Sequence, residues 1–256
     1  MRLGWIAALA GAVALAGCAF EPPPDPNDPA QVGVLQPEVL MRNLRWAAEF
    51  YTERKLRGEI DDAQLRQLLS DYANQLVATV DLDQINPVSA WKYGDVFRTA
   101  ERWDLAEKAL VMAVDFAKRS RNEDRRVNDS LRLAQVLAHQ GRVDEAIQMA
   151  RSTFDTPPDQ KAPILYAVLY EIVPAAERKG RDAELAKLLE DAIDQHSQVV
   201  VDPNSDSGRA FLGARRHHLS LAWQRVVRLY RQAGRASEAE RAQDRAFRMM
   251  SEQQRI

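Results

Sequence analysis

The chain has 256 residues, of which 46% are hydrophobic and 28% are charged, so it can bury a core and is not globally disordered. Its 35 basic and 37 acidic residues give a formal net charge of −2, which argues against a nucleic-acid binder held by bulk charge. The single cysteine excludes an internal disulfide framework and a cysteine-rich zinc site.

The first segment has the pattern of an export signal. A short positive region, Met1-Arg2, precedes residues 3–16, which carry no charge. This apolar stretch suits the core of a signal peptide, because a helix that spans a membrane needs about 20 residues. It ends in Leu15-Ala16-Gly17-Cys18, where small residues precede the chain's single cysteine.

That last motif resembles the lipobox of bacterial lipoproteins. The resemblance implies that residues 1–17 are a signal peptide cleaved after Gly17, and that the Cys18 thiol and the new N-terminus receive acyl chains such as palmitate. Several acyl chains anchor a protein firmly to a membrane. Ala19, in place of Asp, favours the periplasmic face of the outer membrane over the inner membrane. The alternative is an ordinary secretory signal with a chance cysteine, or an uncleaved anchor.

A proline-rich stretch follows the cysteine. Six of the 12 prolines lie between Pro22 and Pro37. Proline disfavours helix and favours extended polyproline II, at about 3.1 Å per residue. We interpret residues 18–37 as a flexible tether that is long enough to hold a folded part up to about 60 Å from a bilayer. A docking site for a proline-binding domain is the alternative.

From residue 38 onward the pattern is helical, and one short phrase recurs. Successive phrases end 43, 40, 39 and 54 residues apart. We expect a Gly with positive φ to end one helix, Asp or Ser to cap the next, and a small residue to let two helices approach closely. Helical hairpins repeated at that scale predict a solenoid. The phrases are Gly58–Ala63, Glu101–Ala106, Gly141–Ala146, Gly180–Leu185 and Gly234–Ala239.

These units resemble the tetratricopeptide repeat (TPR), most clearly in the second, third and last hairpins. The period exceeds the family's 34 residues, and the closing proline of each unit is missing or displaced. The resemblance implies an all-α, right-handed solenoid of about ten helices over residues 38–256; a generic antiparallel bundle is the alternative. The matching positions are Gly94, Phe97, Trp103, Ala106, Leu110 and Ala113, then Ala134, Leu137, Gly141, Ala146 and Ala150, and finally Trp223, Val227, Tyr230, Gly234, Ala239 and Ala246.

The periodicity also predicts where the helices begin and end. Pro163 suits the first turn of a helix, whereas Pro174 lies inside one and should kink it. The predicted helices cover residues 38–57, 61–80, 88–101, 103–119, 124–140, 143–154, 162–179, 182–200, 209–233 and 236–253.

Candidate catalytic and metal-binding motifs are better explained in other ways. Ser89–Lys92 matches the SxxK of penicillin-recognising enzymes, but the SDN and KTG elements are absent. Asp202–Gly208 resembles the start of a calcium loop without its bidentate Glu, so we interpret it as a linker that caps the next helix. Adjacent His217 and His218 point about 100° apart on a helix and cannot share a metal as an i, i+4 pair. The sequence therefore predicts no catalytic residue, no metal and no cofactor.

The TPR resemblance also implies a concave groove lined by the first helix of each hairpin. Trp, Tyr and Arg often anchor interfaces, with ordinary packing as the alternative for each residue. The family's clamp for chaperone tails is not supported, because Trp91 and Asp95 stand where it needs Lys and Asn. The expected groove residues are Trp91, Asp95, Arg98, Asn128, Leu131, Gln135, Tyr170, Glu177, Gln224, Arg228 and Arg231.

These features together predict a non-catalytic adaptor or assembly scaffold for a complex of the cell envelope. We expect it to be anchored through lipid on Cys18 and to bind an unknown protein or peptide in the groove. It would act as a monomer or as part of a hetero-complex. The alternative is a cell-wall enzyme with an unrecognised site, which would need a second domain or an acid pair in a pocket.

Overall fold

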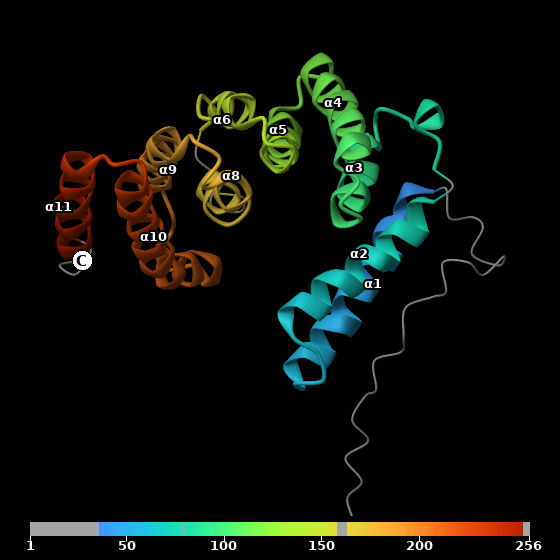
Figure 1. The fold of residues 1–256 in the computed structure, drawn as a ribbon, viewed down its shortest axis with the longest axis horizontal. Coiled ribbons are helices and arrows are strands. Elements are labelled where there is room, and N and C mark those ends of the chain that lie inside the picture. The colour runs from blue at the N-terminus through green and yellow to red at the C-terminus, as the bar shows by residue number, and fades with distance from the viewer. Residues whose placement is uncertain (1–35, 79, 158–162, 253–256) are drawn as a thin grey trace, which may run out of the picture.

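A computed structural model describes residues 36–78, 80–157 and 163–252. Over these residues the chain is helical throughout, and consecutive helices pair as hairpins that stack into an arch (Figure 1). The elements are α1 (Pro37–Leu56), α2 (Asp62–Val77), η2 (Leu82–Gln84), α3 (Ala90–Thr99), α4 (Trp103–Arg119), α5 (Glu123–His139), α6 (Val143–Arg151), α7 (Ile164–Ala167), η3 (Val168–Ile172), α8 (Val173–Ala176), α9 (Asp182–Ser197), α10 (Asp206–Gln232) and α11 (Ala236–Glu252).

The predicted all-α hairpin solenoid is confirmed. Because α7, η3 and α8 form one continuous helix, the described residues contain the ten long helices that the sequence predicts, besides the short 3₁₀ turn η2. Cys18, the signal peptide and nearly all of the tether lie outside the described residues. Within the described ranges, no helix is both long and apolar enough to cross a membrane.

The recurring phrase forms the tight turn of each hairpin. Its glycines have φ between 71° and 85°, a conformation in which a Cβ atom would crowd the residue's own backbone. In the second hairpin Glu101 takes this left-handed conformation, with φ 55°. The expectation for helix capping is right for α2, where Asp61 accepts a hydrogen bond from the Gln64 backbone N–H at 2.8 Å. It is wrong for α4, α6 and α9, whose N-cap positions hold arginine without a side-chain cap. There the Asp lies inside the first helical turn, where its negative charge favours the helix N-terminus. In α9 this residue, Asp182, also accepts a hydrogen bond from the Arg178 backbone N–H at 2.8 Å.

The hairpins pack through small residues at the predicted crossing points. Ala106 and Ala146 are fully buried. Gly94 of α3 faces Leu110 of α4 so closely that a Cβ atom on it would lie 2.7 Å from the Leu110 Cγ. A continuous hydrophobic core therefore runs from α1 to α11.

The helix of residues 164–176 departs most from the expectation. Instead of a simple kink at Pro174, it widens into the π-helical turn η3 and ends at Ala176. Proline lacks an N–H and its ring crowds the preceding turn, which favours such a widening. The Val173 N–H bonds to the Val168 carbonyl, which leaves the Leu169 carbonyl without a partner in its own helix. That carbonyl accepts a hydrogen bond from Arg225 of α10 at 2.9 Å instead.

Candidate functional site

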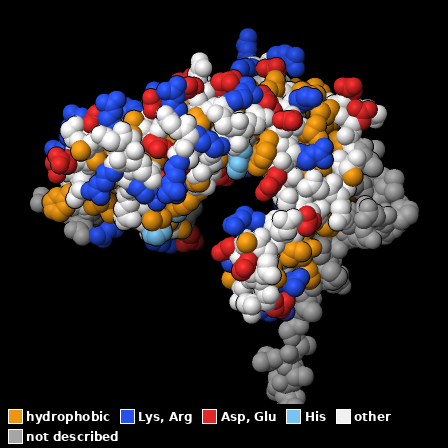
Figure 2. Space-filling model, in the orientation of Figure 1, with side chains coloured by type: hydrophobic (Ala, Val, Ile, Leu, Met, Phe, Trp, Pro, Cys, Tyr) orange, Lys and Arg blue, Asp and Glu red, His pale blue; other side chains and the backbone are white. Residues whose placement is uncertain are grey.

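The first helices of successive hairpins lie on the inner side of the arch. These are α3, α5, the α7–η3–α8 helix and α10, while α4, α6 and α9 lie on the outer side (Figure 1). Figure 2 shows the hollow that this inner face forms with the α1–α2 hairpin. Short turns at regular intervals place the first helices there, so the inner face follows from the repeat itself.

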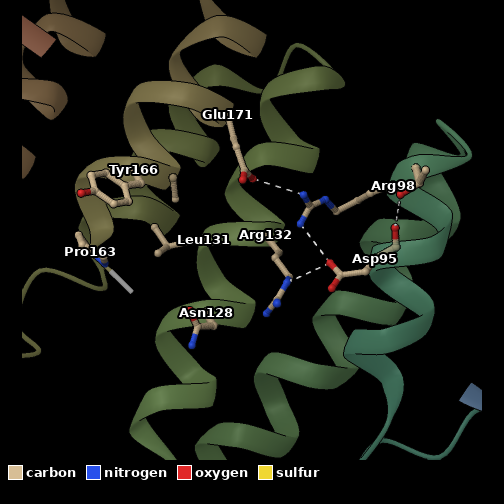
Figure 3. A pocket seen from close by; sticks show the side chains of 10 residues that line it. Asp95, Arg98, Asn128, Leu131, Arg132, Pro163, Tyr166 and Glu171 are labelled. Carbon is tan, nitrogen blue, oxygen red and sulfur yellow. Dashed lines mark hydrogen bonds and ion pairs between the residues drawn. The ribbon is translucent and has the colours of Figure 1, made fainter. Parts of the chain in front are cut away.

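A first cavity of about 390 Å³ lies between α3, α5 and the α7–η3 segment (Figure 3). Four of the predicted groove residues line this cavity. Its other lining residues were not predicted from the sequence. Its lining consists of the predicted Asp95, Arg98, Asn128 and Leu131 together with Thr99, Arg132, Pro163, Tyr166, Ala167 and Glu171.

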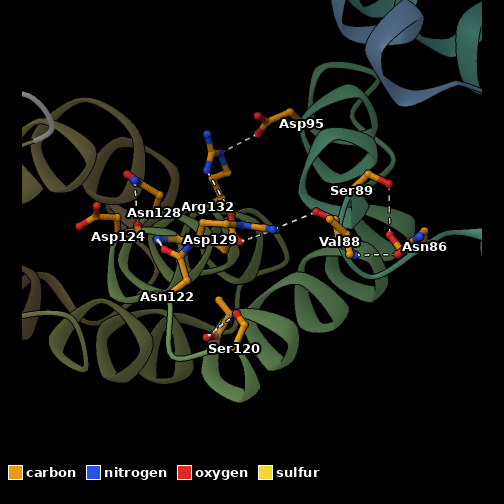
Figure 4. A network of polar contacts seen from close by, with 12 residues as sticks. Asn86, Val88, Ser89, Asp95, Ser120, Asn122, Asp124, Asn128, Asp129 and Arg132 are labelled. Atoms are coloured by element: carbon orange, nitrogen blue, oxygen red, sulfur yellow. Dashed lines mark hydrogen bonds and ion pairs between the residues drawn. The ribbon is translucent and has the colours of Figure 1, made fainter.

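One wall of this cavity is built on a buried carboxylate (Figure 4). Asp129 of α5 has only 2% of its surface exposed and lies 3.2 Å from Arg132 and 3.4 Å from Arg125. Burial raises the pKa of Asp129, and the two guanidinium groups oppose that shift. Arg125 also donates to the Val88 carbonyl at 2.9 Å, so this pairing fixes α5 against the start of α3.

Further ion pairs continue from α5 across the inner face. Arg132 Nε lies 3.0 Å from Asp95 of α3, and Asp95 lies 3.2 Å from Arg98. Arg98 in turn reaches Glu171 of η3 at 3.3 Å. Burial lowers the pKa of Arg98, and its two carboxylate partners oppose the shift. The cavity is therefore lined by charges that neutralise one another.

Two predicted groove residues keep polar atoms that are unsatisfied within the described part of the chain. They are the Nε of Arg98 and the Oε1 of Gln135, both buried. A buried donor or acceptor without a partner costs free energy.

The remaining predicted residues do not share that cavity. Trp91 is half-buried against the core, with the Arg132 guanidinium 5.2 Å from its ring centroid. Tyr170 is 46% exposed, and its hydroxyl lies 2.6 Å from Nδ1 of His218. Glu177 lies 3.1 Å from Arg228.

Two further cavities adjoin α10. One, of about 440 Å³, is lined by Leu169, Tyr170, Leu221, Gln224, Arg225 and Arg228. The other, of about 380 Å³, lies between α10 and α11 and is lined by Ser220, Trp223, Gln224, Val227, Arg231, Gln243, Ala246 and Met250. In place of the expected single groove, the inner face thus carries a series of three cavities, and the predicted residues Trp91, Gln135 and Glu177 line none of the three.

The residues of the SxxK-like and calcium-loop-like motifs make structural contacts instead. Ser89 donates to the Asn86 carbonyl at 3.3 Å, and Lys92 pairs with Glu38 of α1 at 2.5 Å. Ser205 caps α10 by accepting from the Gly208 N–H at 3.0 Å, as predicted for the polar linker. Among the residues that the structure describes, no group of three or more His, Cys, Asp or Glu side chains is placed to hold a metal ion.

Neither a protein-family model nor a curated protein sequence matches the chain. Among solved structures, the chain is similar to a crystal structure of nearly identical TPR-like repeats assigned to a kinesin light chain of Podosopora anserina. The two share 16% sequence identity with a TM-score of 0.46, over 85% of this chain and 98% of the other.

Proposed function

We propose that the protein is a non-catalytic adaptor that binds a protein or peptide segment along the inner face. The observation that carries this proposal is the series of three cavities between the first helices of consecutive hairpins and α11. A segment laid along the arch would contact α3, α5, η3 and α10 in turn. Such a surface recognises a chain by many side chains at once, which is the usual mode of a solenoid.

We also propose that lipid on Cys18 attaches this adaptor to the periplasmic face of the outer membrane, where it helps assemble an envelope complex. The support is in the sequence: the Leu15–Cys18 motif, Ala19 and the proline-rich stretch before α1.

Capture of the partner from detergent-solubilised membranes, followed by mass spectrometry, tests the role of the inner face. Asn128→Ala combined with Tyr170→Ala removes side chains from the first and second cavities without opening the core. We expect this variant to lose the partner that the unaltered protein captures.

The matched control is Lys118→Ala combined with Arg119→Ala, two exposed residues at the end of α4. This pair should leave capture unchanged, and both variants should keep the melting temperature of the parent. Loss of capture in the control but not in the inner-face variant would contradict the proposal.

A further inference from the structure

The two ends of the inner face differ in how their arginines are paired. In the first cavity Arg98 and Arg132 each lie within 3.3 Å of two carboxylates. On α10, by contrast, Arg225, Arg228 and Arg231 together have one carboxylate within 4.0 Å among the described residues, Glu177. The α10 end therefore carries an excess of positive charge.

Two of these three guanidinium groups are open to a ligand. Arg225 is held by the Leu169 carbonyl at 2.9 Å, which fixes it to η3. The Arg228 side chain is 50% exposed, and Arg231 is exposed with a single contact to the Gln243 amide oxygen at 3.3 Å. Residues three apart on a helix lie on the same face, so Arg228 and Arg231 present neighbouring guanidinium groups.

Apolar surface lies beside each of these arginines. The cavity at Arg228 includes Leu169, Leu221 and the exposed ring of Tyr170. The cavity at Arg231 includes Trp223, Val227 and Met250. Gln224 lines both cavities, so they adjoin along α10.

We infer that the α10 end of the inner face binds an acidic segment of the partner protein, an inference that rests on the proposed function. Apolar side chains of the segment occupy the two cavities, and Asp or Glu side chains between them pair with Arg228 and Arg231. Guanidinium groups bind carboxylates through two parallel hydrogen bonds, which makes this pairing both strong and directional. The alternation of apolar and anionic groups is a property of a polypeptide. A flat anionic bilayer would need these arginines on an outer surface, whereas both line cavities beside α10, a helix on the inner side of the arch (Figure 1).

Selection from phage-displayed random dodecapeptides on the full-length protein in detergent tests this inference. We expect the bound pool to be enriched in Asp or Glu within two positions of an apolar residue. A fluorescein-labelled selected peptide should bind about tenfold more weakly to Arg228→Gln combined with Arg231→Gln, as measured by fluorescence anisotropy. The same peptide with Asn and Gln in place of Asp and Glu should lose affinity to a similar extent on the unaltered protein.

The matched control is Arg241→Gln combined with Arg248→Gln, which removes the same charge from exposed positions of α11 that line neither cavity. An equal loss in this control, a selected pool without acidic enrichment, or no selected pool at all would overturn the inference. The inference would also be overturned if the protein bound phosphatidylglycerol vesicles and Arg228→Gln combined with Arg231→Gln abolished that binding. Any of these results, if partner capture still depends on Asn128 and Tyr170, would overturn the acidic specificity and leave the proposed function standing.

Discussion

His196 of α9 is a titratable residue that the fold buries among aromatic rings. Its side chain has 1% of its surface exposed, and its ring centroid lies 5.2 Å from that of Phe211 and 5.8 Å from that of Tyr166. Neither ring nitrogen has a hydrogen-bond partner among the described residues. Burial, followed by the positive charge of Arg215 and the proximity of His218, lowers the pKa of His196 to about 4. The folded protein therefore holds this imidazole in its neutral form.

This burial predicts a loss of stability in mild acid. An unfolded histidine has a pKa of about 6.5, so between that value and about 4 the unfolded chain binds more protons than the folded one. The stabilisation from neutral His196 is complete above the unfolded pKa and is lost as the pH falls towards 4. We expect its contribution to the free energy of unfolding to fall by about 2 kcal/mol between pH 7.5 and pH 5.

Urea unfolding of the parent and of His196→Leu at the two pH values measures this difference. The variant should lose most of the pH dependence. A residual slope should remain from His139 and His218, since burial lowers the pKa of each of them as well. An identical slope in parent and variant would show that His196 is not the group responsible.

Gly94 and Gly213 offer a second test at the level of single residues. Alanine at position 94 would bring Cβ to 2.7 Å from the Cγ of Leu110, whose side chain is fully buried and would have to shift within a packed core, so Gly94→Ala should destabilise by about 1–3 kcal/mol. Gly213 lies within α10, where an added methyl group would meet nothing within 4 Å, and Gly213→Ala should stabilise by about 0.5–1 kcal/mol. Thermal melts should therefore move in opposite directions, and a shared direction would refute the assigned packing of α3 on α4.

At the level of helices, the elements could be predicted because their signals are local. The glycines with positive φ lie where the repeated phrase placed them, and most helix ends agree with the expectation to within three residues. The π-helical turn could not be predicted, because Pro174 is compatible with a kink as well as with a widened turn, and the Arg225 that satisfies the freed Leu169 carbonyl lies 56 residues away. The extra residue in this turn rotates Glu171 relative to a regular α-helix. A prediction from regular helical periodicity therefore does not place Glu171 at the first cavity.

The α6 helix allows a direct test of the repeat's crossing points. Ala146 is fully buried where α6 packs against α5, and interiors have little spare volume. Ala146→Trp should destabilise the protein by at least about 1–3 kcal/mol through overpacking. Gln148→Trp places the same side chain on the exposed face of α6 and should change the melting temperature little. Equal melting temperatures for the two variants would mean that the crossing point lies elsewhere.

At the scale of the whole molecule, the candidate site depends on how the hairpins stack. The repeat pattern predicted Asp95, Arg98, Asn128 and Leu131 on one face, and the stacking of neighbouring hairpins brings these four side chains to one cavity. It missed Tyr166, which reaches the cavity through the packing of α7 against α5, and Arg132 of α5, which lies against Asp95 of α3. It also joined all the predicted residues into one groove, whereas eight of them are distributed over three cavities and Trp91, Gln135 and Glu177 line none of the three. The curvature of an arch arises from contacts between hairpins, which leave no periodic signal in the sequence.

The proposed attachment of the protein to a membrane is tested at the scale of the whole molecule. The first helix, α1, lies at the opposite end of the arch from α10 and α11 (Figure 1). A lipid anchor joined through the residues before Pro37 would therefore hold the molecule by one end and leave the inner face accessible to a partner. We expect mass spectrometry to find the mature N-terminus at an acylated Cys18, and the protein in the membrane fraction, released by detergent but not by salt. Cys18→Ala should appear in the soluble fraction or remain as an uncleaved precursor, whereas Ala19→Ser, which keeps the thiol, should stay with the membrane. An unmodified Cys18, or a mature chain that starts after it, would disprove the anchor while leaving the binding role of the inner face to its own test.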